Sequence, residues 1–329
     1  MSSESPEAIV GRHNELDYKL HPLAHEKLYS SSAPELSQIL SREGIRIEAQ
    51  TYTRFDAEAE SARSRYRMWM GLTNLGAFCT SVFSAGAMAW SLIGRDAAAL
   101  QSGALAHGAI ALSAGAALSA AAASAGLVYL RQGRMLERWM NKRALAETHR
   151  ARYFEGVLSI AEKEKPEAAG LALEYFRRYQ FEVQSNYYYA RARKHEKSAN
   201  QTVALGALGG FVASLSSLFV VFGAAEPGVG AVSVFGAAIG ALAIGREQMN
   251  QDRRNAERYD RTYSALTALA KRLDAIRAAV AKGKIELIGE FGTAVNDQIS
   301  NEHRQWLDDG EAVDPALSRI QEALQSTTK

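Results

Sequence analysis

The chain has 329 residues, of which 47% are hydrophobic and 22% are charged, and its formal net charge is +2. So small a total charge predicts neither nucleic-acid binding nor attraction to anionic lipid. The single cysteine, Cys79, excludes an intramolecular disulfide framework and a cysteine-based metal site. The N-terminal residues lack an apolar stretch after a basic start, so we expect no cleavable secretory signal.

The N-terminal region, residues 1–55, contains prolines, a serine-rich patch and a helical run that starts near Leu36. This mixture predicts a partly ordered cytoplasmic arm. His21 and His25 are four residues apart, as two ligands of one metal could be. Pro22 disturbs a helix between them and no third ligand is near, so we expect no metal site.

Two long runs without formal charge follow the arm. Residues 68–93 contain no charged side chain, and Trp69 and Trp90 lie near their ends, where tryptophan favours the membrane interfaces. Residues 103–130 are also uncharged apart from the titratable His107. His107 lies near one end of its run, so it could line a pore or simply reach interfacial water. The two runs predict a first transmembrane hairpin.

A second pair of apolar runs covers residues 202–222 and 229–245, with a turn around Pro227 between them. The last run has only 17 residues and would rise about 25 Å, near the lower limit for crossing a bilayer, so it could instead be a buried helix. Taken together, the four runs predict an all-α integral membrane protein with four transmembrane helices, arranged as two tandem hairpins.

Basic side chains gather on one side of these four runs. The hairpin tips contribute only Arg95, whereas the other flanks carry Arg63, Arg65, Arg67, Arg131, Arg134, Arg138, Arg191, Arg193, Arg246, Arg253 and Arg254. Short loops rich in arginine and lysine stay on the cytoplasmic side of a membrane. We therefore expect both termini and residues 131–201 to be cytoplasmic, with the long helices forming a bundle there.

Small residues recur at four-residue spacing in the hairpins. The candidate packing residues are Gly115, Ser119, Gly206, Gly210, Gly236 and Gly240. This spacing lets two helix backbones approach closely in lipid. The pattern does not name the partner helix, so it agrees equally with homo-oligomers and with hairpins that close on themselves.

The chain contains an internal duplication. Arg143, Ala146, Glu147 and Tyr153 follow the first hairpin with the same spacing as Arg253, Ala256, Glu257 and Tyr263 after the second. Ala62-Arg63-x-Arg65 likewise matches Ala190-Arg191-x-Arg193 before the hairpins. The organisation is an arm, a module at 56–165, a module at 166–282 and C-terminal helices at 283–329. In that last part we expect a helix over 285–309 and a short one near Pro315.

No nucleotide-binding loop, metalloprotease motif or nucleophile motif is present, so we expect neither an enzyme nor a bound cofactor. Aromatic and basic residues mix in one run, which includes Arg177, Arg178, Tyr179, Arg191 and Arg193. Such residues can stack on bases, but beside a membrane they also contact lipid headgroups or a signalling ligand. We expect the lipid or signal contact and no nucleic-acid partner.

A basic helix, a small-residue hairpin and a long helix with Trp139, Arg143, Ala146 and Glu147 resemble the SLATT superfamily. The unit occurs twice, which also resembles the related four-transmembrane effectors of conflict systems. The resemblance covers about residues 56–306. It implies a bacterial inner-membrane effector of a conflict system that disrupts the membrane after a cytoplasmic signal, from a sensor protein or a nucleotide messenger. A non-conducting membrane scaffold that docks a cytoplasmic partner, or an ion channel, would also agree with the sequence.

Overall fold

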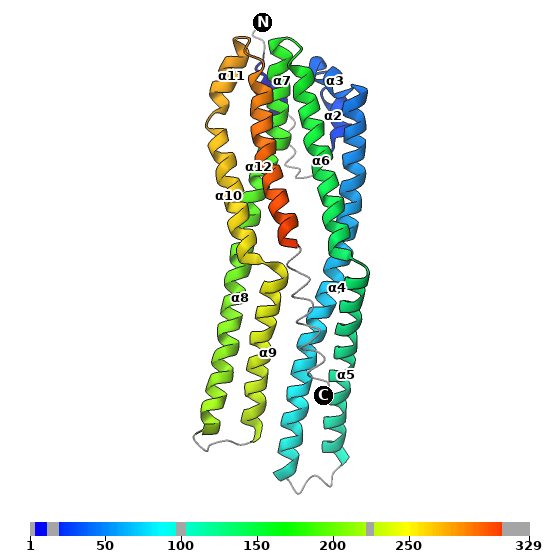
Figure 1. The fold of residues 1–329 in the computed structure, drawn as a ribbon, viewed down its shortest axis with the longest axis vertical. Coiled ribbons are helices and arrows are strands. Elements are labelled where there is room, and N and C mark those ends of the chain that lie inside the picture. Colours follow the sequence, from blue (N-terminus) through cyan, green and yellow to red (C-terminus); the bar gives the residue numbers. More distant parts are fainter. Residues whose placement is uncertain (1–3, 12–19, 97–102, 222–226, 311–329) are drawn as a thin grey trace. The chain divides into compact units, whose positions relative to one another are not determined.

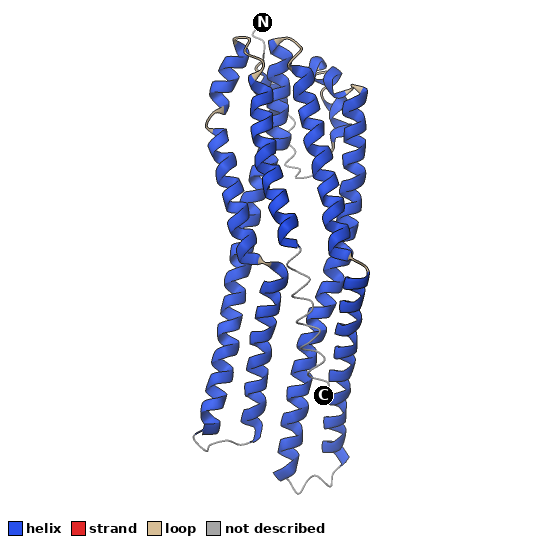
Figure 2. Cartoon of the chain, in the orientation of Figure 1, coloured by secondary structure: helices blue, strands red, loops and turns tan. Residues whose placement is uncertain are grey.

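The computed structural model describes residues 4–11, 20–96, 103–221 and 227–310, and every regular element among them is a helix (Figures 1 and 2). The predicted all-α class is confirmed for this part of the chain. The helices belong to two compact units. Unit 1 takes the described residues up to 62 with 137–194 and 254–309, and unit 2 takes those of 63–136 and 195–253.

Unit 1 is a helical bundle. Its elements are α1 (Pro6–Gly11), α2 (Pro22–Leu28), α3 (Pro34–Leu40), the start of α4 (Glu43–Asp96), α6 (Met135–Ala161), α7 (Pro166–Phe176), the π-helix η2 (Arg177–Glu182), the start of α8 (Val183–Val221), α10 (Asp252–Ala270), α11 (Leu273–Ala281) and α12 (Leu287–Gly310). Proline opens α2, α3 and α7. Proline suits a first helical turn because its fixed φ is helical and its missing N–H would have had no partner there.

The described part of the N-terminal region is mostly helical. Its helices α2 and α3 contribute Tyr29 and Leu36 to the core of unit 1, and both side chains are fully buried. The start of α4 adds Ile45 and Tyr52 to the same core. Within the predicted partly ordered arm, the described helices thus fold against the distant helix α7 through contacts that no local pattern reveals.

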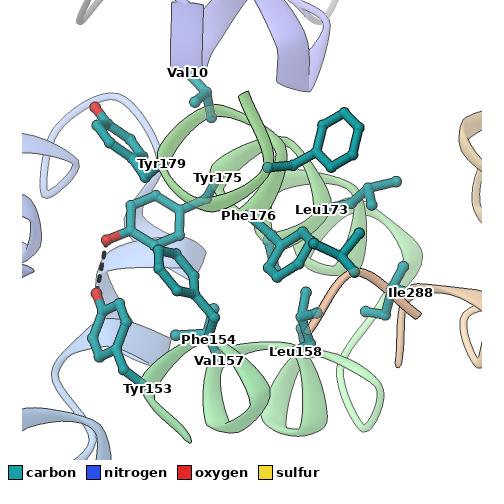
Figure 3. Packing of buried hydrophobic residues seen from close by; sticks show 14 of the residues in the cluster. Val10, Tyr153, Phe154, Val157, Leu158, Leu173, Tyr175, Phe176, Tyr179 and Ile288 are labelled. Atoms are coloured by element: carbon teal, nitrogen blue, oxygen red, sulfur yellow. Dashed lines mark hydrogen bonds between the residues drawn. The ribbon is translucent and has the colours of Figure 1, made fainter. Parts of the chain in front are cut away.

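The core of unit 1 is packed by an apolar stripe of α6 against α7 and α12 (Figure 3). The labelled members are Val10, Tyr153, Phe154, Val157, Leu158, Leu173, Tyr175, Phe176, Tyr179 and Ile288. The residues of this group on α6 are Tyr153, Phe154, Val157 and Leu158. They recur at the three- and four-residue spacing of one helical face, which explains why a single stripe meets both α7 and α12.

Unit 2 contains the two hairpins. The later part of α4 pairs with α5 (Gly103–Gln132), and the later part of α8 pairs with α9 (Pro227–Asn250). The predicted spans 68–93, 103–130, 202–222 and 229–245 coincide with these helices. Residue 222 alone among them lies outside the described part of the chain.

Each hairpin is followed by a break in the helix. Arg134 between α5 and α6 has φ 44°, and Gln251 between α9 and α10 has φ 47°. A side chain in this left-handed region costs about 1–2 kcal/mol, so a repeated break of this kind is a structural counterpart of the duplication.

The C-terminal helix agrees closely with its prediction, since 285–309 was expected and α12 is Leu287–Gly310. The short helix expected near Pro315 lies outside the described residues.

Candidate functional site

The first hairpin is closed by small residues on both helices. A Cβ atom built on Gly76 of α4 would lie 2.9 Å from the Ser119 carbonyl oxygen and 3.0 Å from the Ala123 Cβ of α5. On α5, a Cβ atom on Gly115 would lie 3.2 Å from the Phe83 ring. The two predicted residues of this hairpin, Gly115 and Ser119, therefore pack inside it.

The second hairpin is closed by direct backbone contact. A Cβ atom on Gly209 of α8 would lie 2.6 Å from the Gly240 nitrogen and 2.7 Å from the Gly236 oxygen of α9. A Cβ atom on Gly236 would lie 2.6 Å from the Ala213 nitrogen. Real side chains essentially never tolerate such distances, so glycine is required at both positions.

The predicted glycines of the second hairpin divide into two groups. Gly236 lies in the helix contact, and a Cβ atom on Gly206 would be in ordinary contact with Ala243 at 3.6 Å. Cβ atoms on Gly210 and Gly240 would meet nothing within 4 Å. The sequence analysis did not identify Gly209 as a packing residue, although Gly209 and Ala213 have the same four-residue spacing of small residues.

Large apolar side chains point outward along the helices of both hairpins. The exposed ones are Met68, Leu72, Leu75, Met88, Trp90, Ile110, Leu118, Val128 and Tyr129 on the first, and Val203, Leu205, Leu208, Phe211, Leu215, Leu218, Val232, Val234, Phe235 and Ile244 on the second. Leu118 is 73% exposed and Val203 is 66% exposed. An apolar surface of this extent marks a membrane or interaction surface.

Two of the described helices are long and apolar enough to cross a membrane, over Glu43–Ser91 and His107–Gln132. Only 22% and 17% of their most apolar stretches are buried, unlike a helix in the core of a soluble protein. Both belong to the first hairpin. The side chain of His107 is exposed on α5.

A polar cluster lies beside the second hairpin. The buried carboxylate of Asp252 is 2.6 Å from His195 Nδ1 and accepts a hydrogen bond of 2.6 Å from the Ser198 hydroxyl. Arg246 also donates to the Ser198 oxygen at 3.1 Å. Burial acts to raise the pKa of Asp252, but these hydrogen bonds and charges outweigh burial and hold it below its ordinary value. The cluster ties α8 to α10, because it joins residues on both helices.

A chain of hydrogen-bonded rings crosses the bundle of unit 1. The Tyr175 hydroxyl is 2.7 Å from the Tyr153 hydroxyl and 2.7 Å from His25 Nδ1, and Tyr29 and Tyr179 pair at 2.9 Å (Figure 3 shows the first contact). Burial raises the pKa values of Tyr29, Tyr153 and Tyr175, so these phenols stay protonated and can donate. The chain explains why α2 packs on α7.

Three residues predicted to contact lipid or a signal are instead held inside the bundle. Arg177 pairs with Glu174 and Glu182, and Arg178 and Tyr179 are buried. Arg178 and Tyr179 therefore do not present an exposed surface to lipid, and the contact with a signal stays a prediction. By contrast, Arg193 is exposed and Arg191 is half-buried.

The other predicted pair, Arg191 and Arg193, lies over tyrosine rings of the same helix. The guanidinium of Arg191 is 5.1 Å from the centre of the Tyr187 ring, and that of Arg193 is 5.7 Å from the centre of the Tyr189 ring. These cation–π contacts hold both guanidinium groups close to the surface of α8.

The repeated motif is used differently in the two modules. In the first, Arg143 pairs with Glu147 one turn later and with Asp56 of α4 at 3.0 Å, while Ala146 and Tyr153 are buried. The motif thus fastens α6 to α4.

The second copy of the motif lies nearer the surface. Arg253 and Glu257 are exposed, Ala256 is half-buried, and the ring of Tyr263 lies 5.1 Å from that of Tyr189. Among the described residues, no group of three or more histidine, cysteine or acidic side chains could hold a metal ion.

The family model of the SMODS and SLOG-associating 2TM effector domain 1, SLATT_1, matches residues 176–306. The predicted SLATT resemblance is confirmed for this segment. It begins at Phe176, next to η2, and contains the second hairpin and most of α12, whereas the first hairpin lies outside the match. The SLATT match and the two apolar helices indicate a membrane-associated protein. Searches of curated proteins and of solved structures found no match.

Proposed function

We propose that the protein is a membrane effector of a bacterial conflict or defence system. In this proposal both hairpins cross the inner membrane, and the termini and unit 1 are cytoplasmic. The outward-facing apolar side chains of the four hairpin helices are the observation that carries it, because such a surface is stable in lipid and costly in water.

A separate finding supports a membrane location for each hairpin. The first hairpin supplies the two helices that, among the described residues, are long and apolar enough to span a membrane. The second lies in the segment that matches a domain whose name describes two transmembrane helices and an effector. Four spans follow if both indications hold.

The proposed action is permeabilisation of the inner membrane by a homo-oligomer after a cytoplasmic signal. The signal class that the SLATT resemblance implies is a sensor protein or a nucleotide messenger. Each hairpin is closed by close helix contacts, which leaves no room for water between its own two helices. A conducting path would therefore form between hairpins or between copies of the chain, once a ligand favours that arrangement.

Outward glycines on the second hairpin are the candidate contact between copies. A Cβ atom on Gly210 or Gly240 meets open space, so the side chains of Gly210→Leu and Gly240→Leu start away from the α8–α9 contact and should keep a neighbouring copy away. Ala204→Leu, at another exposed position of α8, is the matched control. Cross-linking in membranes should show smaller assemblies for the two glycine variants and unchanged assemblies for the control. A chain that is monomeric in mild detergent and does not cross-link in membranes contradicts this part.

A scaffold that docks a partner without conducting is the second candidate, favoured by the closed hairpins. Cells that express the chain with its natural partner system separate the two candidates. The effector proposal expects loss of membrane potential, propidium uptake and growth arrest under activating conditions. Intact potential and normal growth under those conditions would reject it in favour of the scaffold.

A further inference from the structure

The π-helix η2 lies within one continuous helical path from α7 to α8. Phe176, Arg177 and Val183 all have right-handed helical backbone angles, so the chain does not turn away at either end. A π turn bonds each residue to the fifth one along instead of the fourth. It therefore takes up one residue more than an α-helical turn, and α7 and α8 keep their own packing on either side.

A buried arginine of α6 holds this wide turn. Arg150 is 3% exposed, and it donates from Nε to the Gln180 side-chain oxygen at 2.6 Å and from Nη2 to the Tyr179 carbonyl oxygen at 2.9 Å. Both acceptors belong to η2. Gln180 also donates to Asn296 of α12 at 3.4 Å. Arg150 also lies over the Tyr52 ring of α4, 5.9 Å from its centre, and no carboxylate occurs among its described contacts, so its side-chain hydrogen bonds go to the π turn.

The aromatic contact between α8 and α10 tolerates a change of register by one position. Tyr187, Tyr188 and Tyr189 are consecutive, and the rings of Tyr187 and Tyr188 lie 6.3 Å and 5.9 Å from that of Tyr259. A shift by one would place Tyr187 where Tyr188 now packs. Aromatic contacts with α10 would thus survive the shift.

We propose that η2 is a register switch held in its wide form by Arg150. If the turn becomes α-helical, its extra residue is released into the helix, and α8 rotates by about 100° and moves about 1.5 Å away from α7. Arg191 would then take the buried place of Ala192, which makes the π form the resting state. The rotation would move His195 and Ser198 away from Asp252. If it continues into the second hairpin, it puts Leu208 in the place of Gly209, so that α8 and α9 must separate there. That last consequence rests on the proposed function, whereas the change of register does not.

Single cysteines in a Cys79→Ala background test the switch in the full-length protein. At rest, Ala192→Cys should be protected from a thiol reagent and Arg191→Cys should react more readily. Arg150→Met removes the hydrogen bonds to η2, which should raise the labelling rate of Ala192→Cys by about tenfold or more. The same change should lower the labelling rate of Arg191→Cys, a result that general loosening of the bundle cannot produce.

A deletion provides the matched control. Removing Glu182 takes out the extra residue, joins Phe181 to Val183 in an α-helix and keeps both Arg150 acceptors. Combined with Arg150→Met, it should restore protection of Ala192→Cys. Unchanged labelling in Arg150→Met, a rise at both cysteine positions or a failure of the deletion to restore protection would each overturn the inference.

Discussion

Two neighbouring glycines of α8 should respond in opposite ways to the same substitution. In Gly209→Ala the new methyl group would begin 2.6 Å from the Gly240 nitrogen and 2.7 Å from the Gly236 oxygen. Ordinary contact begins near 3.4 Å, so α8 and α9 must separate by roughly 0.8 Å at a backbone contact that has no flexible side chain to yield. Overpacking of this kind costs about 1–3 kcal/mol.

The matched control is Gly210→Ala. Its methyl group meets nothing within 4 Å, so only helix propensity changes, and alanine gains up to about 1 kcal/mol over glycine. Thermal unfolding of the purified protein in mild detergent, followed by circular dichroism, should show a lower Tm for Gly209→Ala and an unchanged or higher Tm for Gly210→Ala. Equal shifts of the two variants would refute the assigned hairpin contact.

Two further predictions concern polar groups. Tyr153→Phe removes one hydrogen bond of Tyr175 and should lower the free energy of unfolding by about 0.5–1.5 kcal/mol. Tyr175→Phe removes the contacts with both Tyr153 and His25 and should lower it further. Equal losses of the two variants in denaturant unfolding would contradict the hydrogen-bonded chain. In the folded protein the pKa of Asp252 lies below its ordinary value, so its ionised form stabilises the fold. This contribution is fully present at a pH above the ordinary pKa and is lost as the pH falls through the lower pKa of the folded state. Asp252→Asn should therefore lower the Tm at neutral pH, and its difference from wild type should shrink below about pH 4; a constant difference across that range would contradict the assignment.

The helices themselves were predictable from the sequence. Charge-free runs with basic residues on one side gave all four hairpin helices, and periodicity placed α12 within two residues at its start and one at its end. These features are local, since they depend on which residues recur at helical spacing.

Long-range contacts were not predictable in the same way. The bond between His25 and Tyr175 joins residues 150 positions apart, so no local pattern could reveal that the N-terminal helices complete the core. The GxxxG spacing identified glycine-rich faces but could not choose between Gly210, which has open space beside it, and Gly209, which meets α9. Such a choice depends on helix rotation, which tertiary packing fixes.

Cysteine labelling in intact cells tests most directly whether the second hairpin crosses the membrane as the first does. Single cysteines replace Ala98, Pro227 or Ser159 in a Cys79→Ala background, and a membrane-impermeant thiol reagent is added before or after lysis. Ala98→Cys and Pro227→Cys should react before lysis, and Ser159→Cys, at an exposed position of α6, should react only afterwards. Reaction of Ala98→Cys in intact cells with Pro227→Cys protected until lysis would contradict a crossing by the second hairpin.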